Sequence, residues 1–179
     1  PAVAAASATV AGIVELASSA ETATGTDTDR AVTPAGLHSV FDKGARVTNS
    51  ANQSIPNNAF TTLTFNTEDF DTDSIHDNVT NNSRLTATTA GKYLVYGNVR
   101  FAANATNTRG VRFLSSTLGG GVAEVRVQAS SSIVVLIIST VIDMAAADYI
   151  ELQAYQNSGG ALNSEASGGA PSFGMQGIV

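Results

Sequence analysis

The feature that most constrains the fold is a series of short apolar runs that extends from Ala45 to the end of the 179-residue chain. Each run is rich in Val, Ile, Leu, Phe or Tyr, and Gly, Asn and Ser cluster between the runs. Runs of this length, bounded by turn-forming residues, are typical of antiparallel strands. Nine strands are predicted: Ala45–Asn49, Phe60–Phe65, Arg84–Thr88, Lys92–Ala103, Arg109–Ser115, Val122–Gln128, Ile133–Asp143, Asp148–Gln156 and Phe173–Val179. Their number and spacing predict one all-β domain over residues 45–179, a jelly-roll β-sandwich.

The seventh predicted strand, Ile133–Asp143, is apolar on both of its faces. Alternation along the strand places one set of branched side chains together on the first face: Ile133, Val135, Ile137 and Val141. The second face carries Val134, Leu136, Ile138 and Ile142. A strand with one solvated face should not be apolar on both sides, because exposing four aliphatic side chains forgoes several kcal/mol at ~25 cal/mol per Å². The outer face is therefore predicted to meet another subunit of a homotrimer, and the alternative is a strand wholly inside the core.

The composition excludes several classes of function. The chain has 15 Asp and Glu against 9 scattered Lys and Arg, a net charge of −6, so the clustered phosphate contacts of a nucleic-acid-binding protein are not expected. It has no Cys and only two histidines, His38 and His76, which excludes disulfides, thiolate chemistry and multi-His metal sites. The strongest apolar run, Ile133–Ile142, is much shorter than the ~20 residues of a membrane-spanning helix. No enzyme activity and no membrane insertion are expected.

Residues 1–44 are rich in Ala, Thr and Ser and contain two signals for the start of a helix. Ser18–Glu21 has the pattern of a capping box, and Gly25 is expected to end the helix that follows. Thr33 is a second predicted cap, with a helix over Pro34–Lys43 after it. This region is therefore predicted to be a short stalk or attachment segment of mixed strand and helix.

The second predicted helix is too short to be stable alone, because isolated helices in water need ~12–15 residues. It places Leu37, Val40 and Phe41 on one face. That face is expected to pack against copies of itself or against the domain that follows. Because the chain begins at Pro1 rather than Met, we expect it to be a fragment or a processed product.

Four patterns follow one another in this region: Gly-Ile-Val-Glu-Leu-Ala at residues 12–17, Ala-Glu at 20–21, Gly-Thr-Asp-x-x-Arg at 25–30 and Thr-Pro-x-x-Leu at 33–37. Their order resembles a repeat found in the tail fibres of tailed bacteriophages. The resemblance implies an intertwined trimeric stalk that connects a virion to a distal domain. The residues alone leave a second interpretation, a disordered linker rich in Ala and Thr.

Eight sequence segments of the β domain also follow one another in an order that is typical of a known superfamily. They are Phe60–Phe65, Phe70-Asp71, Asp77, Ser83–Tyr93, Val111–Phe113, the long apolar strand, Ala147–Leu152 and Phe173–Val179. This order resembles the superfamily of tumour necrosis factor and the complement-one-q globular head, most closely in the Ala90–Tyr93 turn and the Asp148–Leu152 strand. Ala146 and Ala147 depart from it, since relatives often have a glycine there. The resemblance implies a trimeric jelly roll that presents a ligand-binding head, and it transfers no single binding residue.

An acidic loop is the one candidate metal site. Its carboxylates are Asp69, Asp71, Asp73 and Asp77, with Glu68 and His76 beside them. Asp-x-Asp-x-Asp is typical of calcium loops, but the helix-loop-helix pattern requires Gly and Glu where Ser74 and Thr80 stand. The loop is therefore either a calcium site outside that pattern or a solvated loop with local Asx turns. No other cofactor is expected, and His76 is predicted to be a surface histidine.

Two long polar loops, residues 103–109 and 156–171, are candidates for ligand recognition, because loops held by a rigid scaffold often carry it. The side chains that could hydrogen-bond a sugar or a protein are Asn104, Asn107, Arg109, Gln156, Asn157 and Asn163. The alternative is that these loops are solvated connections.

These patterns together predict a bacteriophage fibre or spike protein that forms a homotrimer on the virion surface. Residues 1–44 would attach it to virion proteins, and the head would bind a glycan or protein of the host surface. The trimer interface is expected at Leu37, Phe41, Ile133, Val135, Ile137 and Val141. The alternative is a capsid or tail decoration protein without receptor recognition. A depolymerase is disfavoured, because polysaccharide-processing sites usually expose aromatics and the chain has no Trp and 6% aromatic residues.

Overall fold

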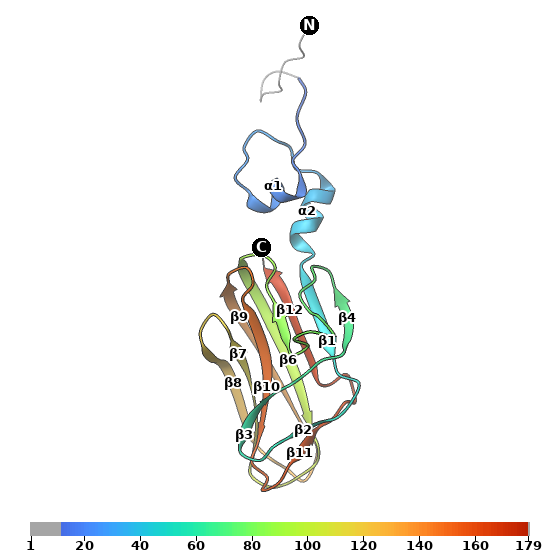
Figure 1. The fold of residues 1–179 in the computed structure, drawn as a ribbon, viewed down its shortest axis with the longest axis vertical. Coiled ribbons are helices and arrows are strands. Elements are labelled where there is room, and N and C mark those ends of the chain that lie inside the picture. The colour runs from blue at the N-terminus through green and yellow to red at the C-terminus, as the bar shows by residue number, and fades with distance from the viewer. Residues whose placement is uncertain (1–11, 179) are drawn as a thin grey trace. The chain divides into compact units, whose positions relative to one another are not determined.

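The structure is a computed structural model that describes residues 12–178. The beginning of the predicted segment 1–44 and the last residue of the predicted strand Phe173–Val179 lie outside the described residues. The chain divides into two compact units, one that ends at Lys43 and one over Gly44–Ile178 (Figure 1). None of the helices in the described part of the chain has the length and apolar character needed to cross a membrane.

The first helix of the N-terminal unit, α1 (Ser19–Thr24), has the predicted capping box. The backbone N–H of Glu21 donates to Ser18 Oγ at 3.3 Å, and the backbone N–H of Ser18 donates to Glu21 Oε2 at 2.9 Å. Each bond satisfies an amide that the first helical turn leaves without a partner. Gly25 ends α1 in the left-handed region, with a φ of 64°. The sequence prediction for this helix is confirmed.

The second helix, α2 (Pro34–Phe41), begins as predicted and ends two residues earlier than expected. Thr33 caps it by accepting a hydrogen bond from the Gly36 N–H at 3.0 Å. Gly36 is buried against α1, and a Cβ at this position would collide with the hydroxyl of Thr22. The two short helices therefore pack through a glycine and a threonine, which leaves little apolar surface between them.

A single guanidinium holds the rest of the N-terminal unit together. The Arg30 guanidinium contacts the carboxylate oxygens of Glu15 at 3.2 Å, Glu21 at 2.9 Å and Asp27 at 2.5 Å. Two backbone bonds, Ala17 N–H to Ala31 O and Ala31 N–H to Glu15 O, join the segments before α1 and after it. Polar contacts thus stabilise this unit where a larger domain would use an apolar core.

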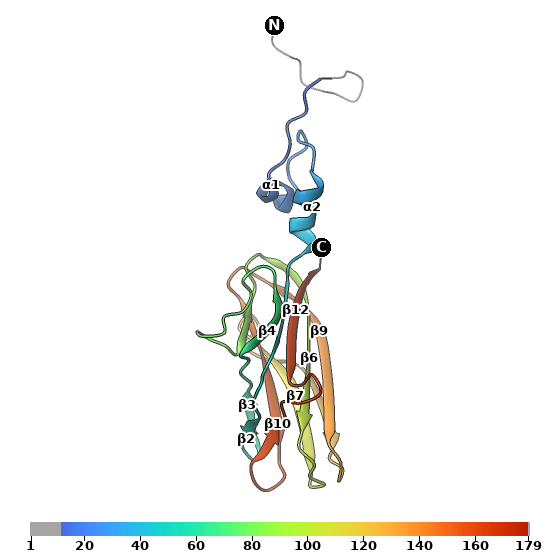
Figure 2. The same ribbon diagram turned by 90° about the vertical axis from the view of Figure 1, so that its right-hand side faces the viewer.

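The second unit is a sandwich of two antiparallel sheets, seen from two sides in Figure 1 and Figure 2. The first sheet has seven strands and the order β2-β11-β6-β12-β1-β4, with β9 on the other side of β6. The bounds of its strands are β1 (Gly44–Thr48), β2 (Gln53–Ile55), β4 (Thr67–Asp71), β6 (Gly91–Phe101), β9 (Val134–Met144), β11 (Leu162–Ser164) and β12 (Ser172–Ile178). β6 pairs with β9 over its whole length, from Gly91 opposite Met144 to Phe101 opposite Val134.

The second sheet has five strands and the order β3-β10-β7-β8, with β5 beside β10. Its strands are β3 (Ala59–Thr62), β5 (Arg84–Thr86), β7 (Thr108–Ser115), β8 (Gly120–Gln128) and β10 (Tyr149–Gln156). β10 pairs with β7 along one edge, and β3 and β5 divide its other edge between them. The all-β sandwich predicted from the sequence is confirmed.

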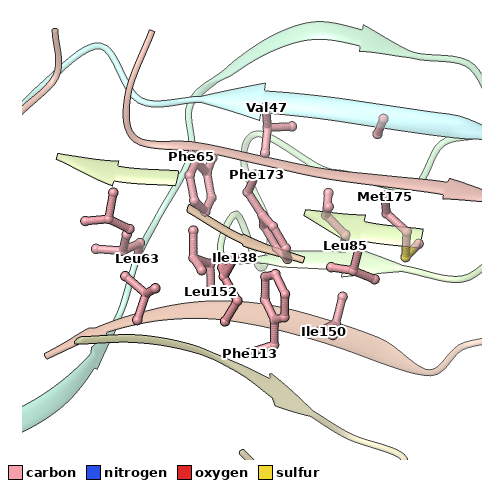
Figure 3. Close-up of a cluster of buried hydrophobic side chains, with 14 of the residues drawn as sticks. Val47, Leu63, Phe65, Leu85, Phe113, Ile138, Ile150, Leu152, Phe173 and Met175 are labelled. Atoms are coloured by element: carbon pink, nitrogen blue, oxygen red, sulfur yellow. The ribbon is translucent and has the colours of Figure 1, made fainter. Parts of the chain in front are cut away.

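The core lies between the two sheets, where the inward-facing side chains of alternate strand positions meet (Figure 3). Three aromatic rings pack in succession at its centre: the Phe173 ring centroid lies 5.5 Å from that of Phe65 and 5.9 Å from that of Phe113. Aliphatic side chains fill the space around the rings, among them Val47, Leu63, Leu85, Ile138, Ile150 and Leu152. The inward face of β9 supplies part of this core.

The predicted strand over Phe60–Phe65 ends at Thr62 in the structure, although Leu63 and Phe65 stay buried. Three strands of three to five residues, β2, β4 and β11, are absent from the sequence prediction. Segments this short carry too few alternating positions to be recognised without their partners.

Four loops lie together at one end of the sandwich. They are residues 56–58, 102–107, 129–133 and 157–161, and we call them the distal loop surface. Gly44 lies near the other end, because it pairs with Gln176, which in turn pairs with Leu94 near the start of β6. The distal loop surface begins where β6 ends, at Phe101. Phe101 is seven residues beyond Leu94, which corresponds to roughly 23 Å along the strand.

Candidate functional site

Arg109 lies at the start of β7 and is fully buried beneath the distal loop surface. Its Nη1 donates to the carbonyl oxygens of Thr106 at 2.9 Å and Thr108 at 3.0 Å, and its Nη2 donates to that of Asn104 at 2.7 Å. Burial lowers the pKa of the guanidinium. In place of the ligand contact expected from the sequence, this side chain fixes the loop between β6 and β7 from inside.

Gln156 has the same role under a neighbouring loop. It is fully buried at the end of β10, and its Nε2 donates to the carbonyl oxygens of Ile55 at 2.9 Å and Gly160 at 2.7 Å. Its Oε1 accepts hydrogen bonds from the backbone N–H and the hydroxyl of Ser158. Buried in this way, Gln156 positions the loop and does not reach a ligand at the surface.

The sequence contained the signal for this inward orientation. Arg109 precedes the core residue Val111 by two positions, and Gln156 follows the buried Ala154 by two positions. In a strand, residues two apart lie on the same face, so both side chains had to point inward. The polar composition of the adjoining loops concealed this alternation.

The asparagines among the predicted binding residues join the loops to one another. Asn107 Nδ2 donates to the Asn157 carbonyl at 2.9 Å, and Asn157 Oδ1 accepts the Thr108 N–H at 2.7 Å. Asn104 is half-buried and accepts the N–H of Thr106 within its own loop. Asn163 lies exposed on β11, and its carbonyl accepts the N–H of Ala102 at the start of the same loop.

Two further loops of the distal loop surface were not predicted as functional. The loop over residues 56–58 is joined to β10 by bonds from Asn58 N–H to the Gln156 carbonyl and from Tyr155 Oη to Asn58 Oδ1, both 2.7 Å. The Gly159 N–H donates to Asn57 Oδ1 at 2.8 Å. Residues 129–133 begin with an Ala129 N–H bond to the Asn107 carbonyl. Their turn-forming residues marked them as loops, but nothing in the sequence placed them together.

Each carboxylate of the acidic loop bonds to a different set of partners. Asp71 accepts backbone N–H bonds from Asp73, Ile75 and His76. Asp77 accepts those of Val79 and Thr80, which lower the pKa of its carboxyl. Asp69 pairs with Arg46 at 2.7 Å, and the Asp73 carboxylate contacts Thr88 Oγ1.

These partners correspond to the Asx-turn interpretation of the acidic loop. Within residues 12–178, no three acidic or histidine side chains are grouped so that they could hold a metal ion. The side chain of His76, predicted at the surface, is instead buried between Glu68 Oε1 at 3.0 Å and the Asn82 carbonyl at 3.3 Å. The prediction of a surface histidine is wrong, because the loop folds over this ring and supplies it with polar partners.

The outward face of β9 is apolar and exposed. Ile137 is 74% exposed, and Ile133, Val135 and Val141 are also exposed, whereas Leu136, Ile138 and Ile142 face the core. The apolar surface continues across the sheet, because Leu94 on β6 lies opposite Val141 and is exposed, as is Ile178 on β12. We call this the β9 face. The interpretation of β9 as a strand wholly inside the core is therefore wrong.

Beside the β9 face, the Tyr96 ring lies close to Gly174, its partner on the neighbouring strand β12. A Cβ at residue 174 would collide with the ring, so this close approach requires glycine. Burial raises the pKa of the Tyr96 hydroxyl, and the charge of the nearby Arg46 acts in the opposite direction. Arg46, Thr48, Asn49, Asp69 and residues 166–170 line a polar recess of about 400 Å³ further across this sheet.

The N-terminal unit exposes most of its apolar side chains. Leu37 and Phe41 are exposed on α2 and line a recess of about 520 Å³ together with Pro34 and His38. Ile13, Leu16 and Val32 are exposed as well. Among the described residues of this unit, Ala17 is the only hydrophobic residue whose side chain is buried.

Comparison with known proteins supports the fold. No protein-family model and no curated protein sequence matches the chain. Solved structures do match it. Murine APRIL at pH 5.0 has a TM-score of 0.60 and 13% identity, and the match covers 75% of this chain and 98% of that one. The globular domain of zebrafish complement 1qA protein has a TM-score of 0.59 and 13% identity, covering 77% and 98%.

Eiger TNF from S. frugiperda has a TM-score of 0.58 and 12% identity, and the match covers 76% of this chain and 92% of that one. At identities this low, the likeness establishes the fold alone. The head is a jelly roll of the tumour necrosis factor and complement-one-q type, as the sequence predicted.

Proposed function

We propose that this protein is a homotrimeric, non-enzymatic appendage on the surface of a bacteriophage virion. Residues 1–44 attach the chain to other virion proteins, and the jelly-roll head binds a glycan or protein of the host surface. The resemblance of residues 12–37 to tail-fibre repeats supports the phage origin and the attachment role. The engagement of His76 and the acidic loop in local hydrogen bonds supports a role without catalysis.

The β9 face is the observation that carries self-assembly, and the resemblance of the chain to trimeric jelly rolls supports three copies. Val135, Ile137 and Val141 on β9, with Leu94 beside them, form an exposed apolar patch on an edge strand of the sheet. A patch of this kind favours aggregation unless another surface covers it. A closed ring of identical chains covers it in every copy without leaving an open edge.

The exposed side chains of the N-terminal unit support assembly at a second place. Ile13, Leu16, Val32 and Leu37 remain exposed in a unit that polar bonds around Arg30 hold together. Packing copies of this unit against one another buries these side chains. Three heads on one stalk would then raise a weak affinity for the host by avidity.

Light scattering tests the assembly. The expected mass is three times the chain mass of 18.2 kDa. Ile137→Glu should give monomers or dimers with an unchanged circular dichroism spectrum, because this side chain is exposed in the single chain and buried in the trimer. The matched control is Val79→Glu, which alters a 90% exposed loop residue and should leave the trimer intact. A monomer mass for the unchanged chain contradicts the assembly.

Binding to bacterial cells tests recognition. Fluorescently labelled trimer is expected to bind at least one strain of a bacterial panel, whereas a decoration protein without receptor recognition binds none. A trimer that binds no strain therefore contradicts the receptor-binding part of the proposal and leaves the structural role.

A further inference from the structure

The distal loop surface is held rigidly before any ligand arrives. Side-chain and backbone bonds connect its loops to one another, and two fully buried side chains, Arg109 and Gln156, bond the loop carbonyls from beneath. Because these bonds already order the backbone, a ligand that binds here pays little conformational entropy.

The exposed polar groups of this surface are all uncharged, and Ile133, the last residue of the third loop, belongs to the adjoining β9 face. The four loops have the sequences Pro-Asn-Asn, Ala-Ala-Asn-Ala-Thr-Asn, Ala-Ser-Ser-Ser-Ile and Asn-Ser-Gly-Gly-Ala, and none contains Asp, Glu, Lys, Arg or His. Asn57, Thr106, Asn107 and Ser131 are exposed there. Amides and hydroxyls both donate and accept hydrogen bonds, as do the hydroxyls of a sugar. The glycines and alanines between them let a ligand approach the backbone closely.

A protein partner fits this surface less well. The central contacts of protein interfaces are enriched in Trp, Tyr and Arg, which the four loop sequences lack. Because the loops also lack aromatic rings on which a sugar could stack, they would hold a sugar through hydrogen bonds alone. Phe60 and Tyr155, which lie next to the loops, pack against each other and against Arg126 on the outer face of the second sheet. An acidic or basic ligand would find no opposite charge in these loops.

We infer that the distal loop surface binds a neutral, polyhydroxylated oligosaccharide. The inference rests on the proposed host-binding function and assigns its ligand class and its location. It also agrees with the position of the surface, roughly 23 Å from the end of the sandwich where Gly44 begins β1, so that attachment and recognition occupy opposite ends of the head.

An array of immobilised polysaccharides tests the inference with the full chain. The neutral probes are dextran, mannan, galactan and neutral bacterial O-antigens, and the acidic probes are alginate, hyaluronan and polysialic acid. We expect binding to at least one neutral probe and to none of the acidic ones. Thr106→Glu should weaken that binding at least tenfold, because it places a bulky charge on the surface. The matched control, Ala146→Glu in the exposed turn after β9, should change it less than twofold.

Three outcomes overturn the inference while the proposed function stands. Two come from the array: binding to acidic probes alone, or binding to neutral probes that Thr106→Glu does not weaken. A third is cell binding that survives periodate oxidation of surface glycans and is lost after protease treatment, which would identify a protein receptor. If the trimer binds neither polysaccharides nor any strain, the receptor-binding function itself fails. Light scattering and circular dichroism of both variants confirm that each is folded and trimeric.

Discussion

At the scale of single residues, the structure separates polar side chains that meet solvent from polar side chains that hold the fold. Arg109 and Gln156 are both buried and bond backbone carbonyls of the loops above them. The Nε of Arg109 has no hydrogen-bond partner, and the hydrogen bonds that its guanidinium makes to described residues all go to backbone carbonyls. A buried cation of this kind is costly, so its bonds to three carbonyls must stabilise the loop.

Arg109→Met should therefore lower the free energy of unfolding by roughly 2 kcal/mol, because three part-buried carbonyls lose their donor, at up to about 1–3 kcal/mol each, partly offset by removing a buried charge. Urea denaturation measures the change. The matched control is Arg126→Met, which removes a guanidinium from a half-exposed position beside Glu124 and should cost less than about 1 kcal/mol. Equal losses for the two variants would contradict the role assigned to Arg109.

At the scale of secondary-structure elements, the sequence of β9 shows that both of its faces are apolar, and the tertiary structure shows which face is buried. Its apolar pattern on both faces is evident from the sequence alone. Which face lies in the core depends on how β9 pairs with β6, where Leu136 lies opposite Val99 and Ile138 opposite Gly97. Shifting this register by one residue would bring Ile137 inside, and the sequence pattern allows either choice.

The element α1 provides a pH-dependent prediction. Hydrogen bonds from Ser18 hold the pKa of the Glu21 carboxyl below its ordinary value of 4.5. A carboxyl whose pKa is lowered on folding adds stability above its unfolded pKa, and this stability is lost as the pH falls through the folded pKa. The capping box of α1 should thus be intact at neutral pH and open in acid.

Carbon-detected NMR of the Glu21 carboxyl during a pH titration checks this expectation. Its titration midpoint should lie below 4.5, and Ser18→Ala should move the midpoint part of the way back, because it removes the side-chain bond and leaves the backbone one. A midpoint at or above 4.5 in the unchanged chain would show that the capping box does not form in solution.

At the scale of the whole molecule, the stabilising core belongs to one unit. All residues of the main buried cluster lie within Gly44–Ile178, from Ala45 to Met175. The N-terminal unit relies on helix caps and the ion pairs of Arg30, which are partly exposed and contribute little each. The jelly roll should therefore fold without the segment that precedes it.

A chain shortened to residues 44–179 should unfold in a single cooperative thermal transition, with a Tm within a few degrees of the full chain at equal chain concentration. The comparison peptide, residues 12–43, should be largely unfolded alone, because its helices are shorter than isolated helices need to be. Differential scanning calorimetry and circular dichroism measure the two. A shortened chain without a cooperative transition would show that the jelly roll depends on its N-terminal segment.

The sequence by itself determined the all-β class, most of the strands, both helix caps and the apolar character of β9, since these depend on local alternation and turn chemistry. The tertiary structure decided which side chains face inward and which loops meet. It buried the His76 side chain, divided the acidic loop among separate partners, and brought four distant loops to one end of the sandwich over Arg109 and Gln156. These outcomes depend on pairing between strands that are far apart in the chain, and local patterns carry no information about that pairing.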